Sequence, residues 1–177
     1  MGETKIKPPS RVAVDTCILL ALADHNHEAW DAVKALRKRL TPVIFLILPT
    51  VLAELCAHSQ GSDPERKRLA DLVFKELRTG IWPDFIPTDF VGVGYGIVEE
   101  VAKSVIRKKL WPDDEWNDAL ILGEASLQES SFILTEDHHF RDMNVVAIRA
   151  AINDYDLTAP TVLSCVTAFQ LANSSET

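Results

Sequence analysis

The sequence predicts an α/β fold with a mainly parallel central sheet. Short apolar runs typical of buried strands alternate with longer segments of helical periodicity. Residues 11–15 are an example of the first kind and residues 27–40 of the second. Strands separated by helices form right-handed βαβ units, whose strands lie parallel in one sheet. The 177 residues, 47% of them hydrophobic and 25% charged, suit one domain with a substantial core.

In the first half of the chain, each strand signal is followed by two helix signals. The run VIFLIL, which ends at Pro49, is typical of a buried strand. The segment 63–80 has the clearest helix boundaries, with Asp63 as N-cap, Pro64 at the first helical position and Gly80 at the end. We expect strands at 11–15 and 42–49 and helices at 17–24, 27–40, 50–59 and 63–80.

The second half carries shorter strand signals between long helical segments. A further short strand is expected within 81–88, where prolines flank an apolar pair. The glycine pattern at 92–96 lacks the spacing of a dinucleotide-binding loop, so we interpret it as a turn or helix start. We expect strands at 131–135 and 144–148 and helices at 97–110, 113–128 and 161–172.

No internal repeat or long linker divides the chain. We expect residues 1–10 to form a tail, 11–150 the folded domain, and 151–177 a C-terminal extension whose helix packs on that domain. The sequence opens without an apolar signal segment, and its longest apolar run is too short to cross a bilayer. These features predict a protein without membrane attachment.

The cysteines point to a reducing compartment. There are three, Cys17, Cys56 and Cys165, all in apolar stretches. Their odd number and the lack of a C-x-x-C motif argue against a disulfide framework and against a zinc site. We expect buried free thiols and a cytoplasmic location.

The net charge of −8 bears on the class of function. Passive DNA- or RNA-binding proteins usually carry excess positive charge, so the charge argues against that class. It leaves open an enzyme that gathers acidic side chains in one place to hold a cation.

Four acidic residues are candidates for such a site. Asp15 and Asp137 follow the strands at 11–15 and 131–135, and the carboxyl ends of parallel strands are where sites form. Glu54 and Asp118 lie in apolar helical stretches without a lysine or arginine partner on their own helices. Each single acid could be structural, and Asp15 and Asp137 could simply cap the helices that follow. The four together favour a shared site.

Clustered carboxylates raise one another's pKa unless a cation compensates their charge. A set of ligands that are all oxygen atoms suits a hard cation, Mg²⁺ or Mn²⁺, better than zinc. The sequence therefore predicts a divalent cation shared by these acids.

Four short motifs in this order resemble PIN domains, especially the small VapC-type endoribonuclease toxins of bacteria and archaea. They are V-D-T at 14–16, P-x-x-x-x-E at 49–54, N-D-A-L-I at 117–121 and L-T-x-D-x-x-F at 134–140. The resemblance covers roughly residues 11–150. It implies a PIN-like three-layer α/β/α sandwich and a nuclease, dependent on Mg²⁺ or Mn²⁺, that hydrolyses RNA phosphodiesters. It also implies an antitoxin protein as partner and a homodimer.

Catalytic and metal-binding roles are assigned to the four acids. We expect Asp15 and Asp118 to be direct ligands, with Glu54 and Asp137 completing the site directly or through water. Asp114 lies one helical turn before Asp118 and could be a fifth acid at the rim, although an N-cap role for Asp113 or Asp114 is favoured.

Further residues are expected to support the site or the substrate. Thr16 and Thr135 can donate hydrogen bonds to carboxylates, and Asn117 could do the same or touch substrate. The group Arg107, Lys108 and Lys109 is the best candidate for phosphate contacts, although these cations could equally stabilise a helix C-terminus.

Two neighbouring features are interpreted as non-catalytic. His138 and His139 are expected to be solvated, and Glu115 and Glu136 to point outward. The alternative for the whole chain is a PIN-like binding or scaffold module without catalysis.

Overall fold

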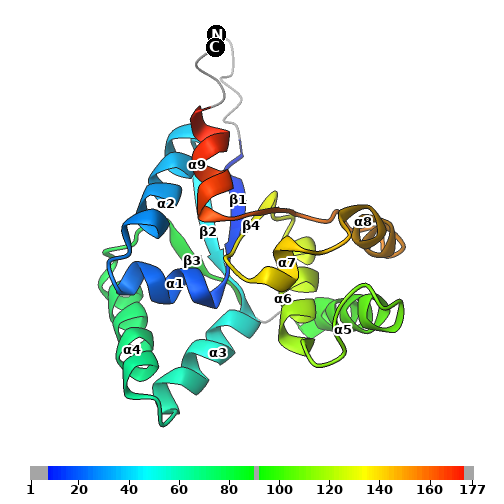
Figure 1. Cartoon of the computed structure of the whole chain (residues 1–177), viewed down its shortest axis with the longest axis horizontal. Coiled ribbons are helices and arrows are strands. Elements are labelled where there is room, and N and C mark those ends of the chain that lie inside the picture. The colour runs from blue at the N-terminus through cyan, green and yellow to red at the C-terminus, as the bar shows by residue number, and fades with distance from the viewer. Residues whose placement is uncertain (1–7, 90–91, 174–177) are drawn as a thin grey trace.

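The computed structural model describes residues 8–89 and 92–173 and has five parallel strands in one sheet, in the order β3-β2-β1-β4-β5 (Figure 1). The strands are β1 (Ser10–Val14), β2 (Val43–Ile47), β3 (Phe85–Pro87), β4 (Phe132–Leu134) and β5 (Thr161–Leu163). Helices flank the sheet on both sides, so the expected α/β/α sandwich with a parallel sheet is confirmed.

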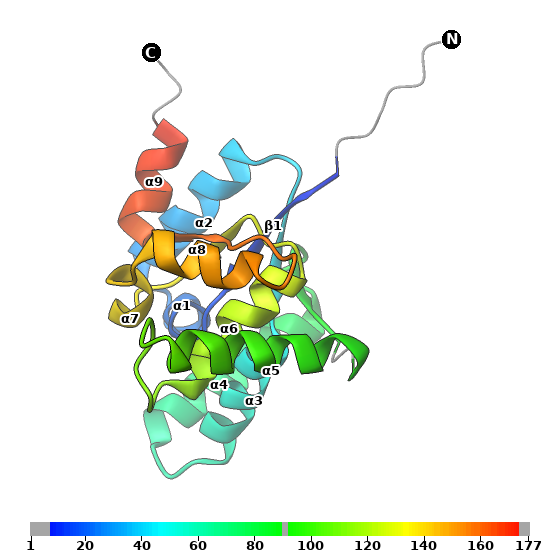
Figure 2. The same cartoon turned by 90° about the vertical axis from the view of Figure 1, so that its right-hand side faces the viewer.

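The helices in the described part of the chain connect the strands in α/β fashion. They are α1 (Thr16–Ala23), α2 (His27–Arg39), α3 (Pro49–Gln60), α4 (Pro64–Thr79), α5 (Gly92–Arg107), α6 (Trp116–Leu127), α7 (His138–Arg141), α8 (Val145–Asn153) and α9 (Cys165–Asn173). Figure 2 shows α5 lying across α6 on one side of the molecule.

The expected boundaries of α4 are confirmed. Asp63 accepts hydrogen bonds from the N–H groups of Glu65 and Arg66, and Gly80 closes the helix in the left-handed conformation.

The central strand β1 positions Asp15, which follows it directly at the carboxyl edge of the sheet. Its residues Val12, Ala13 and Val14 are almost fully buried, because β1 lies between β2 and β4 in the sheet and helices cover both faces. Val14 is in register with Leu134, and the backbone N–H of Asp15 donates to the Leu134 carbonyl at 3.1 Å. The residues that follow β1 and β4 are therefore neighbours at the carboxyl edge of the sheet.

Two sequence-based element predictions are wrong. Residues 144–148 are not a strand: α8 begins there, with Asn144 accepting from the N–H of Ala147, and its buried residues Ile148, Ala151 and Ile152 follow helical spacing. The expected helix 161–172 begins instead with β5, which pairs with β4 before the chain enters α9. Apolar runs of this length fit either type of element, and the neighbours in the fold decide between them.

The chain after residue 150 is part of the same core. The expected boundary at 150 falls inside α8, β5 is an edge strand of the central sheet, and α9 packs against α2. At the other end, residues 1–7 of the expected tail and residues 174–177 of the expected extension lie outside the described ranges, while Ser10 opens β1.

Close packing of α5 on α6 depends on two glycines. A Cβ atom on Gly94 would lie 2.6 Å from Leu127 Cδ2, and one on Gly123 would lie 3.1 Å from the Val98 carbonyl oxygen. The glycine stretch at 92–96 thus opens a helix, as expected, and lets that helix approach α6 closely.

Several smaller expectations are corrected. Cys165 is buried, but Cys17 and Cys56 are exposed. The N-cap of α6 is Glu115, without a side-chain capping bond, and Asp113 instead forms an ion pair with Lys109 at 2.7 Å. In the described part of the chain, no helix has the length and apolar character needed to span a membrane.

Candidate active site

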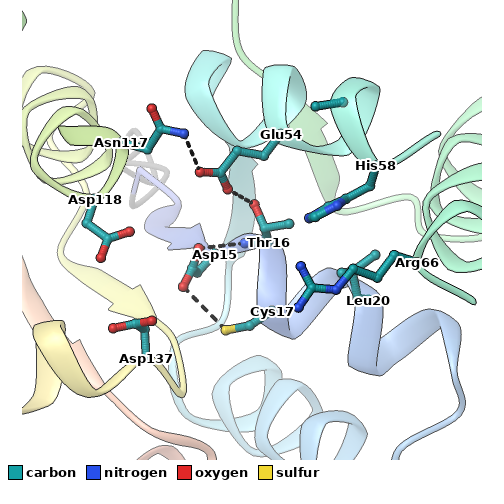
Figure 3. A pocket seen from close by; sticks show the side chains of 11 residues that line it. Asp15, Thr16, Cys17, Leu20, Glu54, His58, Arg66, Asn117, Asp118 and Asp137 are labelled. Atoms are coloured by element: carbon teal, nitrogen blue, oxygen red, sulfur yellow. Dashed lines mark hydrogen bonds between the residues drawn. The ribbon is translucent and has the colours of Figure 1, made fainter. Parts of the chain in front are cut away.

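A cavity of about 440 Å³ opens at the carboxyl edge of the sheet, and the four predicted acids line it (Figure 3). Asp15 follows β1, Glu54 lies on α3, Asp118 lies in the first turn of α6, and Asp137 precedes α7. Residues up to 122 positions apart in sequence thus meet in one pocket because parallel strands and the helices after them converge at this edge.

Asp15 is the most deeply placed of the four, with 6% of its surface exposed. Its Oδ1 accepts from the Thr16 N–H at 2.6 Å. Asp15 therefore caps α1, which was the structural alternative to a role in a shared acidic site. Its Oδ2 accepts from the Thr135 hydroxyl at 2.5 Å and from the Cys17 thiol at 3.3 Å. Burial nevertheless raises the pKa of Asp15, because the loss of hydration outweighs these hydrogen bonds.

Glu54 is held by two side chains that the sequence had singled out. Its Oε2 accepts from the Thr16 hydroxyl at 2.5 Å, and its Oε1 accepts from the Asn117 amide at 2.9 Å. Figure 3 shows the carboxylate between these two donors, on the wall of the pocket opposite Asp137. Thr16 thus ties Glu54 to the start of α1, next to Asp15.

Asp118 and Asp137 form the other side of the pocket. Asp137 caps α7 by accepting from the His139 N–H at 2.7 Å, and its own N–H donates to Thr135 Oγ1 at 2.9 Å. Burial, followed by the negative charges of Asp137, Asp15 and Glu115, raises the pKa of Asp118 to about 7. The ionised form of Asp118 is therefore disfavoured by its surroundings.

The histidine expectation is confirmed for one residue and wrong for the other. The His138 side chain is 71% exposed, whereas that of His139 is 20% exposed. His139 Nδ1 lies 3.3 Å from Asp118, 3.4 Å from Asp137 and 3.8 Å from Glu115. Glu115 accordingly points toward this group rather than outward. Within the described ranges, the ion-pair partners of Asp118 and Asp137 are histidines and not lysine or arginine.

The expected phosphate-binding cations do not lie at the pocket. Lys108 pairs with Asp154 and Lys109 with Asp113, both at 2.7 Å, and neither they nor Arg107 line the cavity. The exposed Asp114 is not among the lining residues either.

Besides the apolar Leu20 and Ala57, sequence reasoning missed three residues that line the pocket with a thiol or a basic side chain: His58, Arg66 and Cys17. His58 follows Glu54 by one helical turn, a spacing that could have revealed it. Arg66 comes from α4, and nothing in the sequence indicates that α4 reaches this edge. Cys17 was noted only as a thiol. Although the residue as a whole is exposed, desolvation of its thiol and the neighbouring charge of Asp15 raise its pKa to about 12, which disfavours the reactive thiolate.

The donor set fits a hard divalent cation. All four carboxylates line one pocket, and hydrogen bonds from Thr135 to Asp15 and from Thr16 and Asn117 to Glu54 orient two of them. Among the described residues, the groups whose ligand atoms lie within 4.8 Å of one another include Asp118 with Glu115 and His139, and Asp137 with His138 and His139. Oxygen ligands of this kind are those that Mg²⁺ and Mn²⁺ bind in proteins.

Comparison with known proteins identifies the fold. No family model matches the sequence, and no curated protein does. Among solved structures, a chain of VapBC2 from Rickettsia felis, bound to a DNA fragment from their promoter, aligns with a TM-score of 0.57 at 15% identity. That alignment covers 87% of this chain and 98% of that chain.

Two further structures align almost equally well. VapBC-1 from nontypeable Haemophilus influenzae and FitAcB from Neisseria gonorrhoeae both give a TM-score of 0.52 at 12% identity, covering 88% of this chain and 98% of the other. At such identities the similarity concerns the fold. The predicted PIN-like fold is confirmed over most of the chain.

Proposed function

We propose that the protein is a metal-dependent endoribonuclease that hydrolyses RNA phosphodiester bonds. The observation that carries this proposal is the convergence of Asp15, Glu54, Asp118 and Asp137 on one pocket without a lysine or arginine paired to Asp118 or Asp137 among the described residues. Such a cluster is costly unless a cation occupies it, and a carboxylate-bound divalent cation suits phosphodiester hydrolysis.

The four acids would hold Mg²⁺ or Mn²⁺, with Asp15 and Asp118 as the closest ligands and Glu54 and Asp137 completing the site. A bound cation lowers the pKa of a coordinated water and stabilises negative charge on the phosphate. The chain itself orients the ligands. Thr135 holds Asp15, Thr16 and Asn117 hold Glu54, and Asp137 is fixed by its bonds to His139 and Thr135.

Arg66 is the side chain best placed to contact the substrate phosphate. Its guanidinium enters the pocket from α4, and Figure 3 shows it on the side away from Asp118. Its ion pair with Asp63 is long, at 3.8 Å, and its side chain is 62% exposed. The neighbouring Arg68, by contrast, is fixed by Glu65 and Asp24. We therefore propose Arg66, rather than Arg107, Lys108 or Lys109, as the first phosphate contact.

The fold supports a proposal about the biological setting. The solved structures that share the fold are VapBC and FitAcB assemblies. By analogy with them, we propose that this chain is the toxin of a toxin–antitoxin pair. A cytoplasmic location, an antitoxin protein as partner and a homodimeric state belong to the same proposal. Light scattering of the purified chain, alone and with the product of a neighbouring reading frame, would test the last two.

An RNA cleavage assay tests the nuclease function. Wild-type protein should cut single-stranded RNA in Mn²⁺ or Mg²⁺ and not in excess EDTA. Asp118→Asn should lower the rate by about a hundred-fold or more, because it removes a proposed ligand. Asp114→Asn is the matched control, since Asp114 is a nearby acid that does not line the pocket.

Two results would contradict the proposal. Equal cleavage by wild type and Asp118→Asn would assign the activity to another site or to a contaminant. Absence of cleavage by the wild type with either metal would favour the alternative, a PIN-like binding or scaffold module.

A further inference from the structure

A second cavity, of about 390 Å³, adjoins the acid pocket. The two cavities share Glu54, Ala57 and Asn117 in their walls. The hydrogen bond from the Asn117 amide to Glu54, seen at the top of Figure 3, therefore lies where the two spaces meet. A ligand bound at the acids can extend past this bond into the second cavity.

The second cavity differs from the first in chemistry. Beyond the shared residues, its walls include the apolar side chains Pro49, Ala53 and Leu120 and the aromatic ring of Tyr95. It contains none of Asp15, Asp118 and Asp137. It therefore offers a mostly apolar surface that includes the ring of Tyr95, directly beside a highly charged site.

The glycine stretch at the start of α5 places Tyr95 there. Gly94 packs so closely on α6 that a Cβ atom would meet Leu127, and one turn later Val98 lies over Gly123. These contacts bring the first turn of α5 against α6, which also carries Asn117 and Asp118. Residues 92–96, which play no part in the metal site, thereby position an aromatic side chain next to it.

We propose that the second cavity receives the base of a nucleotide that flanks the scissile phosphodiester, and that this base stacks on Tyr95. The inference rests on the proposed nuclease function and adds to it a subsite for the base beside the cleaved bond. Bases of single-stranded RNA stack on aromatic side chains, whereas bases within a duplex are already stacked and paired. An apolar cavity that opens from a phosphodiester site matches a flat base attached to the reacting backbone.

Cleavage by Tyr95 variants tests the proposal. The substrate is a labelled single-stranded RNA of mixed sequence whose wild-type cleavage position has been mapped, and the same RNA annealed to its complement. Tyr95→Ala should lower kcat/KM on the single strand about ten-fold, the usual effect of losing one base–aromatic stack. Ile97→Ala, at an exposed neighbour on α5 that does not line the cavity, should cleave like wild type. Tyr95→Phe keeps the ring and should recover most of the rate that Tyr95→Ala loses. The annealed RNA should resist wild type.

A set of substrates with single abasic nucleotides near the cleaved bond provides a second readout, independent of how well Tyr95→Ala folds. Wild type should lose about ten-fold in kcat/KM at one flanking position, and Tyr95→Ala should lose nothing further there, because both changes remove the same contact.

Three outcomes would overturn the base subsite: wild-type rates for Tyr95→Ala, no abasic position that slows the wild type, or equal cleavage of paired and unpaired RNA. If wild type and Tyr95→Phe fail to cleave any of these substrates, the proposed nuclease function fails and the subsite fails with it. Cleavage by wild type with no effect of Tyr95→Ala would refute the subsite alone.

Discussion

Helix α6 carries two largely buried carboxylates with opposite surroundings, Asp118 and Glu124. Glu124 is 3% exposed, and it accepts hydrogen bonds from the Thr50 N–H at 3.1 Å and from the Thr50 hydroxyl at 2.8 Å. It thereby caps α3, whose own N-cap residue, Leu48, has no side-chain oxygen. Asp118 faces other carboxylates and one imidazole.

The difference between these acids shows that burial alone does not identify a functional carboxylate. Burial raises the pKa of both. The bonds from Thr50 oppose that shift for Glu124, whereas the charges of Asp137, Asp15 and Glu115 add to it for Asp118. Donors from Thr50 therefore stabilise the Glu124 carboxylate in its buried position, whereas the charges around Asp118 are largely those of other acids.

The largest expected effect concerns stability. Glu124→Ala leaves the Thr50 N–H and hydroxyl without their partner and should lower the free energy of unfolding by about 1–3 kcal/mol. Asp118→Asn should not lower it in metal-free buffer, because it relieves repulsion in the pocket. Urea denaturation in EDTA measures both. Similar losses for the two variants would show that the two acids do not differ in kind.

A smaller effect is expected from the hydroxyl that joins two of the acids. Thr135 Oγ1 donates to Asp15 and accepts from the Asp137 N–H. Thr135→Val has nearly the same shape but loses both bonds, and should weaken Mn²⁺ binding about ten-fold. Titration calorimetry would measure the affinity, with the exposed Thr158→Val as control. An unchanged affinity for Mn²⁺ would show that Thr135 does not support the cation site.

The smallest effect is a pH dependence of the metal-free protein. The pKa of Asp118 is raised to about 7 in the fold from an ordinary value of 3.8, so its contribution to stability is present at low pH. That contribution is lost as the pH rises through 7. Between pH 6.5 and 7.5 wild type should lose up to about 1 kcal/mol relative to Asp118→Asn. Parallel pH profiles of the two proteins in chemical denaturation would contradict the shift.

The sequence predicted which acids converge better than it predicted the residues around them. Asp15 and Asp137 could be placed because a residue after a parallel strand has a defined position at the sheet edge. Glu54 and Asp118 could be found because they lie in apolar stretches, but the same criterion would have selected Glu124. Only the structure shows that Thr50, far away in sequence, satisfies it.

The remaining differences have a common physical cause. The segment NVVAI, residues 144–148, fits a strand or a helix equally well. It opens a helix because Asn144 caps it and because Ile148, Ala151 and Ile152 pack inward. The approach of Arg66 to the acids and the inward turn of His139 depend on how α4 and α7 pack, which no local pattern encodes. Local signals fix where elements begin, while tertiary packing decides which side chains meet.

Thermal unfolding with and without Mn²⁺ tests most directly whether the four acids hold a cation. Wild type should melt at a higher temperature in Mn²⁺ than in EDTA, because a ligand that binds only the folded state stabilises it. Glu124→Ala should melt lower in both buffers but keep the increase, and Asp15→Asn combined with Asp118→Asn should abolish it. An absent increase in wild type, or an equal increase in the double variant, would contradict a cation site at these carboxylates.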